Sequence, residues 1–578
     1  MAAYDRVLRL VGEDGDSVLA CGALLARAAA RGGSFVHTYH TADNELRCGT
    51  VQCQVRLSDS PVQAVRRQIH LLLFFSGGDF TAHKTDLIPG GTLLCDPQRR
   101  PEESQPGLGC CELPLTELTR ESTGDDQLRY LVAAGALLNL LGIPAEAGCE
   151  AAVGDQLADE TTDTSRIRTA ITAGYHHAEQ FLAASSVPCD WDPAFAAEHD
   201  PMLLDGNQAV ALGALAAGVD FVAGHPLAPA TSILDHLSGE LSRNGGAFLW
   251  MEDEQSAAAS LVGASFAGRR CFTASSGPGL LRMGESVSFA AMAETPLVIV
   301  DVMRAGPATG LPTRTAQADL DFARYGTNGE APRCVIAPAT VADCFWQTVR
   351  AFRIAETYQL PVLLLTDQAL ACSSQIVNRP DFETLEPIQR LRPGPGQTRD
   401  GFARYAVSET GVSPQPIPGL DDLPYVASGY EHDPFGRPDS GAANHLAMTG
   451  RRFHKLAVLG KRITQEPVLE VEREGTEVGI IGWGSSYGAI TEALQRLELR
   501  DGVAVAHLHP RLFSPLNEWR TRRFLGPLRK IICPEQNHTG QYARILRNRF
   551  GVTAVELSRQ DGCPFTPGDL YRAIKEEL

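Results

Sequence analysis

Three acidic residues stand where an apolar, strand-like run meets an alanine-rich, helix-like run. They are Glu252, Asp253 and Glu254, within residues 245–263, GGAFLWMEDEQSAAASLVG. Carboxylates at a helix N-terminus are favoured by the helix macrodipole, which would make these residues purely structural. Alternatively, one glutamate lies in an apolar pocket, where loss of water lets a carboxyl share a proton with a ligand nitrogen. Their position in the sequence does not decide between these roles.

Two arginines follow the apolar run PLVIVDVM. Arg304 and Arg314 belong to residues 304–320, RAGPATGLPTRTAQADL. Ligands collect beyond the carboxyl ends of the strands of an open parallel sheet, and the fork of an arginine suits a carboxylate, so this loop is a candidate anion site. Gly, Pro and Thr are also plain turn formers, and a surface loop with solvated arginines therefore stays an alternative.

Two loops of small residues also follow strand-like runs. TASSGPG, residues 273–279, has backbone amides that a ligand could approach closely, although tight-turn packing explains it equally well. GWGSSYG, residues 482–488, precedes a helix-like run, which is the context of a phosphate site, but a single glycine pattern is weak support. The pairs His37/His40 and His507/His509 lack a nearby ligand set and are expected to be structural.

Strands and helices alternate along the chain, which indicates an α/β fold. Up to about residue 189, strands are expected at 34–39, 49–57 and 69–75 and helices at 128–141 and 165–185, in a mainly parallel sheet. From about 202 to 378 the strand-like runs are apolar throughout, as in parallel strands buried on both faces. Residues 381–455 form a Pro/Gly-rich connection, and a further α/β unit begins near 468.

Composition excludes several classes of protein. The chain of 578 residues has a formal net charge of −18, so it lacks the broad basic surface that nucleic acids or anionic membranes require. No apolar run reaches the length of a bilayer span, the N-terminus has no signal-peptide layout, and a cytoplasmic protein is expected. The 14 cysteines include no C-x-x-C, so they are expected to be reduced thiols rather than metal or cluster ligands.

In order along the chain, six stretches resemble the α subunit of the 2-oxoacid:ferredoxin oxidoreductases, in the form with the γ subunit fused to its N-terminus. The resemblance is nearest to the 2-oxoglutarate enzymes and covers essentially the whole chain. These stretches are MEDE at 251–254 with Gly263, ASSGPG at 274–279, ETPLVIVD at 294–301, GPATGLPT at 306–313, LPVLLLTD at 360–367, and EQN at 535–537 with TGQ at 539–541.

The resemblance implies three α/β domains and a connection between the last two. They are a γ-like domain at 1–190, a pyrimidine-binding thiamine-fold domain at 200–380, a connecting segment at 381–467 and a transketolase C-terminal-like domain at 468–578.

The resemblance also implies decarboxylation of 2-oxoglutarate with coenzyme A, giving succinyl-CoA, CO2 and electrons for ferredoxin, with CO2 fixation in reverse. Thiamine diphosphate would be shared with a separate β subunit, which would supply Mg²⁺, the diphosphate site and a [4Fe–4S] cluster in an (αβ)2 assembly. The sequence agrees with this division, because it lacks both cluster cysteines and a Gly-Asp-Gly motif with a distant Asn.

Site residues follow from the same resemblance. Glu254 matches the acid that activates the cofactor, Arg304 and Thr313 match positions that hold the oxoacid carboxylate, and the implied cofactor contacts are Glu254, Pro229, Ser276 and Gly277.

Two departures from the family pattern limit the substrate and coenzyme assignments. Ala228 replaces a threonine of the family's Tyr-Pro-Ile-Thr-Pro stretch, which weakens any assignment of side-chain preference. Residues 12–17, GEDGDS, carry extra acids that would repel a phosphate, so no coenzyme A site is expected there. The same chemistry on pyruvate or a branched oxoacid, or a non-catalytic relative, stays an alternative.

Overall fold

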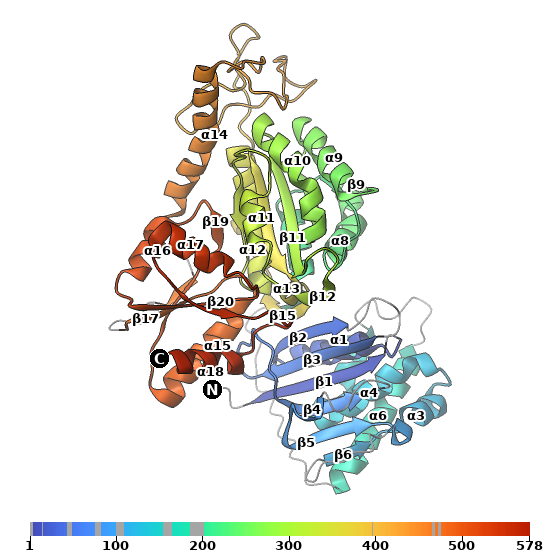
Figure 1. Ribbon diagram of the computed structural model, residues 1–578. Coiled ribbons are helices and arrows are strands. Elements are labelled where there is room, and N and C mark those ends of the chain that lie inside the picture. The colour runs from blue at the N-terminus through green and yellow to red at the C-terminus, as the bar shows by residue number, and fades with distance from the viewer. Residues whose placement is uncertain are drawn as a thin grey trace. The chain divides into compact units, whose positions relative to one another are not determined.

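The structure is a computed structural model and describes residues 4–13, 15–42, 49–75, 83–99, 109–153, 164–184, 201–395, 397–464, 469–471 and 476–578. It contains two compact units, shown in Figure 1. One consists mainly of the N-terminal part of the chain up to Asp205, and the other of most of the chain from Gly206 onward. Within the described residues, no helix is long and apolar enough to cross a membrane.

The N-terminal unit is built on an eight-stranded sheet with the order β6-β5-β4-β1-β3-β2-β15-β7. Its strands are β1 (Asp5–Glu13), β2 (Phe35–Ala42), β3 (Thr50–Ser58), β4 (Ile69–Phe74), β5 (Leu87–Cys95), β6 (Gly109–Glu112), β7 (Pro201–Asp205) and β15 (Ser373–Asn378). Its helices are α1 (Val18–Arg31), α3 (Leu115–Ser122), α4 (Arg129–Leu140), α5 (Ala145–Val153) and α6 (Thr164–Ala184). The strands and helices expected from the sequence in this part are therefore present.

The expectation of a mainly parallel sheet is wrong for this unit. The order β6-β5-β4-β1 is parallel, whereas β3 pairs antiparallel with both β1 and β2, and β15 pairs antiparallel with β2 and β7. A parallel crossover needs a dozen or more residues. The few residues between Ala42 and Thr50 are too short for one, so β3 returns alongside β2 in the opposite direction.

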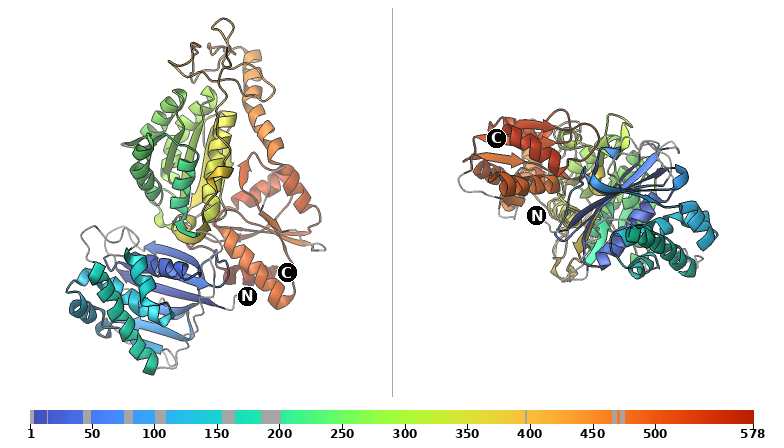
Figure 2. Two further views of the ribbon diagram at one scale, coloured as in Figure 1. Left: turned by 180° about the vertical axis from the view of Figure 1, so that it is seen from behind. Right: turned by 90° about the horizontal axis from the view of Figure 1, so that it is seen from below.

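Helices α4 and α6 pack unusually closely against each other on one face of this sheet, as both figures show (Figures 1 and 2). A Cβ atom at Gly135 would lie 2.0 Å from the carbonyl oxygen of Ile171, and one at Gly174 would lie 1.9 Å from that of Val132. Only glycine allows this backbone contact. The helices shield a large apolar core that includes Leu8 of β1.

The second unit contains an eight-stranded sheet in which β13-β14-β11-β10-β8-β9 are parallel, as predicted for strands that are apolar throughout. Strand β12 pairs antiparallel with β11, and β19 pairs antiparallel with β13. The strands are β8 (Phe221–Gly224), β9 (Ala247–Trp250), β10 (Cys271–Ser275), β11 (Leu297–Ala305), β12 (Leu311–Thr315), β13 (Cys334–Ile336), β14 (Pro361–Asp367) and β19 (Leu512–Ser514).

Helices cover both faces of this sheet (Figure 1). On one face, Phe272 of β10 stacks on Phe352 of α12 with ring centroids 6.1 Å apart. On the other, Met283 and Val287 of α10 pack on Ile299 of β11. The helices of this part are α7 (Gly206–Ala216), α8 (Thr231–Leu241), α9 (Glu254–Phe266), α10 (Gly277–Ala293), α11 (Leu320–Tyr325), α12 (Val341–Tyr358) and α13 (Gln368–Ala371).

Buried charges attach the long helix α14 (Ala442–Ile463) to the end of α10. The carboxylate of Glu294 contacts both Arg451 and Lys455, and all three side chains are buried. Burial alone would raise the pKa of Glu294, but the charges of Lys455 and Arg451 outweigh it and lower this pKa to about 2. Breaking such a pair from one side leaves an uncompensated buried charge, so the contact fixes where the connecting segment leaves the sheet.

A second, five-stranded sheet follows in the order β16-β18-β17-β20-β21. Its strands are β16 (Leu469–Val471), β17 (Val478–Ile481), β18 (Ala506–His509), β20 (Lys530–Glu535) and β21 (Val555–Ser558). The helices of this region are α15 (Ser486–Asp501), α16 (Glu518–Leu525), α17 (Gln541–Phe550) and α18 (Pro567–Glu577). The chain is thus an α/β protein throughout, as the sequence predicted.

Candidate active site

The larger parallel sheet of the second unit changes its direction of growth between β8 and β10. Strand β9 lies on one side of β8, and the next strand in sequence, β10, lies on the other side. In open α/β sheets, such a switch point opens a crevice at the carboxyl ends of the strands, and ligands bind there. The residues predicted from the sequence follow the ends of β8, β9, β10 and β11, so the topology gathers them at one edge of the sheet.

Glu254 begins helix α9 directly after β9, and it is buried, with 4% of its surface exposed. It does not cap the helix. The side chain of Asp253 does this, because its Oδ1 accepts a hydrogen bond of 2.7 Å from the backbone N–H of Ser256. A guanidinium nitrogen of Arg282 lies 3.3 Å from Oε2 of Glu254, and the Arg282 side chain is largely exposed. The buried carboxylate of Glu254 therefore needs an explanation other than capping.

Helix α10 approaches Glu254 through a glycine. A Cβ atom at Gly279 would lie 2.0 Å from Oγ of Ser275 and 2.8 Å from both Cγ and Oε1 of Glu254. The Ser275 hydroxyl is buried and has no hydrogen-bond partner within the described residues. The TASSGPG loop thus brings an unsatisfied polar atom and a buried carboxylate to the same place.

Arg304 lies near the end of β11 and is buried. Its Nη1 donates a hydrogen bond of 2.6 Å to the carbonyl oxygen of Ala228, in the loop that follows β8. The next residue in that loop, Pro229, is held by Asn207, whose Nδ2 donates to the Pro229 carbonyl oxygen over 2.8 Å. The departure from the family pattern at Ala228 thus concerns the side chain, whereas the backbone of this residue orients Arg304.

The other three predicted residues border the same edge. Ser276 is fully buried and its hydroxyl donates to the carbonyl oxygen of Val302 over 2.9 Å. Gly277 begins helix α10. Thr313 lies in the middle of β12, opposite the bulge at Arg304 and Ala305, and is half-buried. The structure therefore brings Pro229, Ser276 and Thr313 to the sheet edge at which Glu254 and Arg304 lie.

Arg314 does not join Arg304. Its Nη1 lies 3.9 Å from the Sγ of Cys563, and its aliphatic part lies close to Gly562. Arg304 of β11 pairs with Thr315 of β12. Arg314 is the neighbour of Thr315 in β12, and successive residues of a strand face opposite sides, so the two arginines point to different surroundings. The pairing of two arginines in one anion site, which the loop composition allowed, is not what the structure shows.

Two acids at this edge were not predicted from the sequence. Asp301 of β11 is fully buried, and Asp319 stands just before α11. Burial raises the pKa of both carboxyl groups above the usual range, and the nearby charge of Arg304 acts in the opposite direction. One signal was available, since Asp301 is the single acid inside the apolar run PLVIVDVM.

The GWGSSYG loop does not offer a helix N-terminus to a phosphate. Oδ2 of Asp367 accepts a hydrogen bond of 2.5 Å from the Ser485 hydroxyl at the start of α15. Burial raises the pKa of Asp367 to about 6, against the effect of the hydrogen bonds from Ser485 and Leu370. The carboxylate of the chain itself takes the place that a phosphate would need.

The loop at residues 12–17 is similar. Asp16 is buried, and its Oδ2 accepts from the backbone N–H of Glu13 over 2.8 Å, while Oδ1 accepts from Arg129 over 3.0 Å. A Cβ at Gly12 would lie 2.8 Å from the Asp16 carboxylate. Asp14 lies outside the described residues. The Asp16 carboxylate thus binds the Glu13 N–H and Arg129, and the absence of a coenzyme A site in this loop stays a prediction.

The histidine pairs of the sequence analysis are buried or half-buried in strands. Burial lowers the pKa of His507 to about 3 and that of His509 well below its usual value, so both rings are neutral. His509 bonds through Nε2 to the carbonyl oxygen of Gly484 over 3.0 Å. Among the described residues, no group of His, Cys, Asp and Glu side chains could hold a metal ion.

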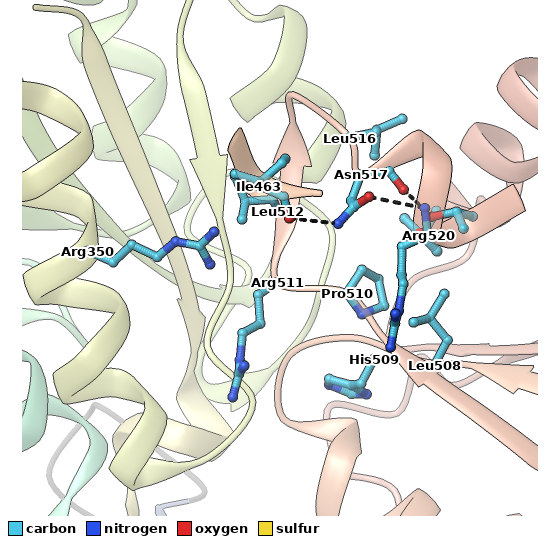
Figure 3. A pocket seen from close by; sticks show the side chains of 12 residues that line it. Arg350, Ile463, Leu508, His509, Pro510, Arg511, Leu512, Leu516, Asn517 and Arg520 are labelled. Carbon is cyan, nitrogen blue, oxygen red and sulfur yellow. Dashed lines mark hydrogen bonds between the residues drawn. The ribbon is translucent and has the colours of Figure 1, made fainter. Parts of the chain in front are cut away.

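A small pocket lies at β19 and α16, with Arg350 of α12 on its far side (Figure 3). Asn517 is one of its lining residues. Its side chain donates a hydrogen bond of 3.0 Å to the Ile463 carbonyl oxygen and accepts one of 3.1 Å from the backbone N–H of Arg520. Arg511 is paired with Asp343, whose Oδ2 lies 2.8 Å from its Nε. None of the predicted site residues lines this pocket, so the candidate site remains the crevice at the sheet edge.

The fold is an α/β fold, and the predicted site residues lie at the switch point of its larger parallel sheet. Two family descriptions match the chain. "Pyruvate flavodoxin/ferredoxin oxidoreductase, thiamine diP-bdg" matches residues 212–445, which include every predicted site residue, and "Pyruvate ferredoxin/flavodoxin oxidoreductase" matches residues 7–176.

Individual relatives match over longer spans. A 2-oxoglutarate oxidoreductase subunit KorA of Mycobacterium tuberculosis is 30% identical over 99% of this chain and 91% of its own. A 2-oxoglutarate synthase subunit KorA of Methanothermobacter thermautotrophicus is 34% identical over 64% of this chain and 95% of its own.

The structure of the 2-oxoglutarate:ferredoxin oxidoreductase of Magnetococcus marinus, with 2-oxoglutarate, coenzyme A and succinyl-CoA bound, superimposes with a TM-score of 0.91. It is 32% identical and covers 99% of both chains. This chain belongs to the 2-oxoacid:ferredoxin oxidoreductase family, and it is a subunit of such an enzyme.

The crevice residues fit the aminopyrimidine part of thiamine diphosphate. Such a ring offers N–H donors and a ring nitrogen. A buried acid can form hydrogen bonds with these groups, and small neighbouring residues leave room for the ring. Glu254 supplies the acid at 4% exposure, and the buried Ser275 hydroxyl is an unsatisfied polar atom beside it. The described residues offer no comparable set for a metal ion or an iron–sulfur cluster.

Proposed function

We propose that this chain is the α-type subunit of a 2-oxoglutarate:ferredoxin oxidoreductase. The reaction converts 2-oxoglutarate and coenzyme A to succinyl-CoA and CO2, and two electrons pass to ferredoxin; in reverse, it fixes CO2. The observation that carries the proposal is that a buried acid, Glu254, and a buried arginine, Arg304, follow the ends of strands in one parallel sheet at its switch point.

Thiamine diphosphate, when bound, supplies the carbanion chemistry of the decarboxylation. The role of Glu254 is to hold a proton against the aminopyrimidine ring and to exchange it. Pro229, Ser276 and Gly277 shape the cofactor side of the crevice, with Ser276 fixed by its bond to Val302.

Arg304 binds the carboxylate of the oxoacid in this proposal, and Thr313 supports it from β12. A planar guanidinium can bind a carboxylate with two parallel N–H donors. The bond from Arg304 to the Ala228 carbonyl oxygen fixes the orientation of the guanidinium plane. Since the Ala228 side chain brings no hydroxyl to the site, the preference for the rest of the oxoacid depends on other groups.

The complete site requires a partner. We propose a β subunit that carries the diphosphate site with Mg²⁺ and a [4Fe–4S] cluster, in an (αβ)2 assembly that delivers electrons to ferredoxin in the cytoplasm. The chain contributes the γ-like domain at 1–190, the pyrimidine domain at 200–380 and the transketolase C-terminal-like domain at 468–578, with 381–467 as the connection. The family match at 212–445 and the relatives named as subunits support this assignment.

The test is the reconstituted complex with a panel of oxoacids. Ferredoxin reduction that depends on both coenzyme A and 2-oxoglutarate, with kcat/KM above that for pyruvate and branched oxoacids, is the expected result. A preference for pyruvate or a branched oxoacid would move the substrate assignment while keeping the chemistry. Absence of coenzyme A-dependent reduction with every oxoacid would identify a non-catalytic relative.

A further inference from the structure

Two carboxyl groups, those of Asp301 and Asp319, come close together at this edge of the sheet. Asp301 is fully buried, and neither of its carboxyl oxygens has a hydrogen-bond partner with a proton to donate within the described residues. Asp301 stands beside Ser275 in the register of β11 and β10, and Oδ2 of Asp319 lies 3.0 Å from the point where a Cβ at Gly277, two residues further on, would stand, so the two carboxyl groups are close together. Two ionised carboxylates only accept hydrogen bonds, so their contact requires a proton between them.

The position of Asp319 shows that this contact is specific. Asp319 stands at the N-cap of α11, where an aspartate side chain ordinarily bonds to the helix, but it makes no such bond. Instead its Oδ2 lies 3.0 Å from the point where a Cβ at Gly277 would stand. The carboxyl group has therefore turned from its own helix towards the floor of the crevice and Asp301.

We propose that Asp301 and Asp319 share one proton, and that the single negative charge of the pair positions Arg304 for the oxoacid carboxylate. The second half of this proposal rests on the proposed function, whereas the first half does not. Like charges in one buried site cannot both ionise at ordinary cost, which is why paired carboxyls retain a proton. The pair is then a positioning device, since it acts through Arg304.

The charge balance explains what the proton does. With one proton, the pair carries one negative charge against the one positive charge of Arg304, which is the cation that faces both acids. A second negative charge would draw the guanidinium away from the Ala228 carbonyl oxygen. A neutral pair would leave Arg304 buried without its counter-charge.

Other titratable groups near the crevice are engaged elsewhere. Asp367, on the neighbouring strand β14 opposite Met303, accepts from Ser485 and from the N–H of Leu370. Glu254, on α9, faces Arg282. The protonation of the Asp301–Asp319 pair is therefore set by the two acids and Arg304.

The first test needs neither partner nor substrate. Asp319→Asn replaces the shared proton by an amide donor and leaves Asp301 ionised. A proton held in the folded chain but not in the unfolded chain makes stability fall as pH rises above about 4. In denaturant unfolding of the full chain between pH 5 and 8, the wild type should lose up to about tenfold in its folding equilibrium constant per pH unit relative to Asp319→Asn.

The control is Asp235→Asn, an exposed aspartate of α8, which should show the wild-type pH dependence. Infrared spectroscopy gives a second readout on folded protein. At pH 7 the wild type should show the carbonyl band of a protonated buried carboxyl, and both Asp301→Asn and Asp319→Asn should lack it. Wild-type pH dependence in Asp319→Asn, or no such band in the wild type, would overturn the proposal.

The second test uses the reconstituted complex. Asp319→Asn should keep the KM for 2-oxoglutarate within about threefold of the wild-type value, and this KM should not change as the pH is raised above neutral. The double variant Asp301→Asn/Asp319→Asn should raise KM about tenfold or more, with a smaller change in kcat. Equal KM values in the single and double variants would overturn the positioning role. Because the first test needs no turnover, an inactive complex with the expected unfolding data would contradict the proposed function and not the shared proton.

Discussion

At the scale of single residues, two adjacent acids divide two roles that the sequence could not separate. Asp253 caps helix α9 through its bond to Ser256, while Glu254 is buried and takes no part in the cap. The sequence indicated that these acids lie between a strand and a helix. Which of them turned inward depended on helix phase and on the approach of α10, and neither is a local property of MEDE.

Glu254→Gln is expected to separate catalysis from stability. The amide is isosteric and can still accept a hydrogen bond, but it cannot exchange a proton, and loss of general acid–base catalysis costs about 10²- to 10⁴-fold in rate. The measurement is hydrogen–deuterium exchange at C2 of thiamine in the assembled complex, alongside turnover. Asp253→Ala is the matched control and should lose about 1 kcal/mol of stability while its exchange rate stays normal. Wild-type exchange in Glu254→Gln would exclude the catalytic role.

Arg304→Lys is expected to raise the KM for the oxoacid about tenfold or more. Lysine keeps the charge but not the planar pair of donors, and a charge-assisted hydrogen bond is worth about 1.5–3 kcal/mol. Steady-state kinetics of the reconstituted complex give the value. Arg314→Lys, whose parent side chain lies against Cys563, serves as the control and should leave KM unchanged. Equal KM values for both variants would place Arg304 outside the substrate site.

At the scale of elements, the alternation of strands and helices was readable, but the fate of the glycine-rich loops was not. Runs such as PLVIVDVM predicted buried parallel strands because their composition is apolar on both faces, and β11 is one. The phosphate-like pattern of GWGSSYG gave no hint that Asp367, 118 residues away from Ser485 in the sequence, fills its helix N-terminus. Contacts of that separation are set by sheet order, which local patterns do not encode.

Helix α10 packs closely against α9 at Gly279, so a side chain at this position should disturb Glu254. Gly279→Ala would place a methyl group 2.0 Å from the Ser275 hydroxyl and 2.8 Å from the Glu254 carboxylate. We expect a loss of about 1–3 kcal/mol of stability from overpacking, and a loss of turnover because Glu254 must move. Gly263→Ala, inside α9 with open space at its Cβ, should instead stabilise the chain by about 0.5–1 kcal/mol. Thermal unfolding and turnover are measured for both variants. Equal stability of the two would show that α10 can shift without loss of stability.

At the scale of the whole molecule, the proposed function gives the chain one side of a site that another subunit completes. Glu254 and Arg304 bring an acid and a cation to the sheet edge. The described residues offer no group of side chains that could hold a metal ion. Activity should therefore be a property of the assembled complex.

The purified chain is expected to be colourless and inactive alone, and to gain oxoacid- and coenzyme A-dependent electron transfer when a β-type partner is added. The rate should saturate near equal amounts of the two chains, because each crevice at β8 and β10 needs one partner surface. Iron bound at stoichiometric level to the isolated chain, measured by metal analysis, would contradict this.

A competition experiment makes the same prediction quantitative. Glu254→Gln changes one buried atom type and should still assemble, so it competes with the wild type for a limiting amount of partner. The rate should then fall in proportion to the fraction of variant added, because each captured partner is held in a complex that cannot exchange the cofactor proton. A rate that stays constant as variant replaces wild type would mean that the crevice carrying Glu254 is not the surface at which the two chains build the active site.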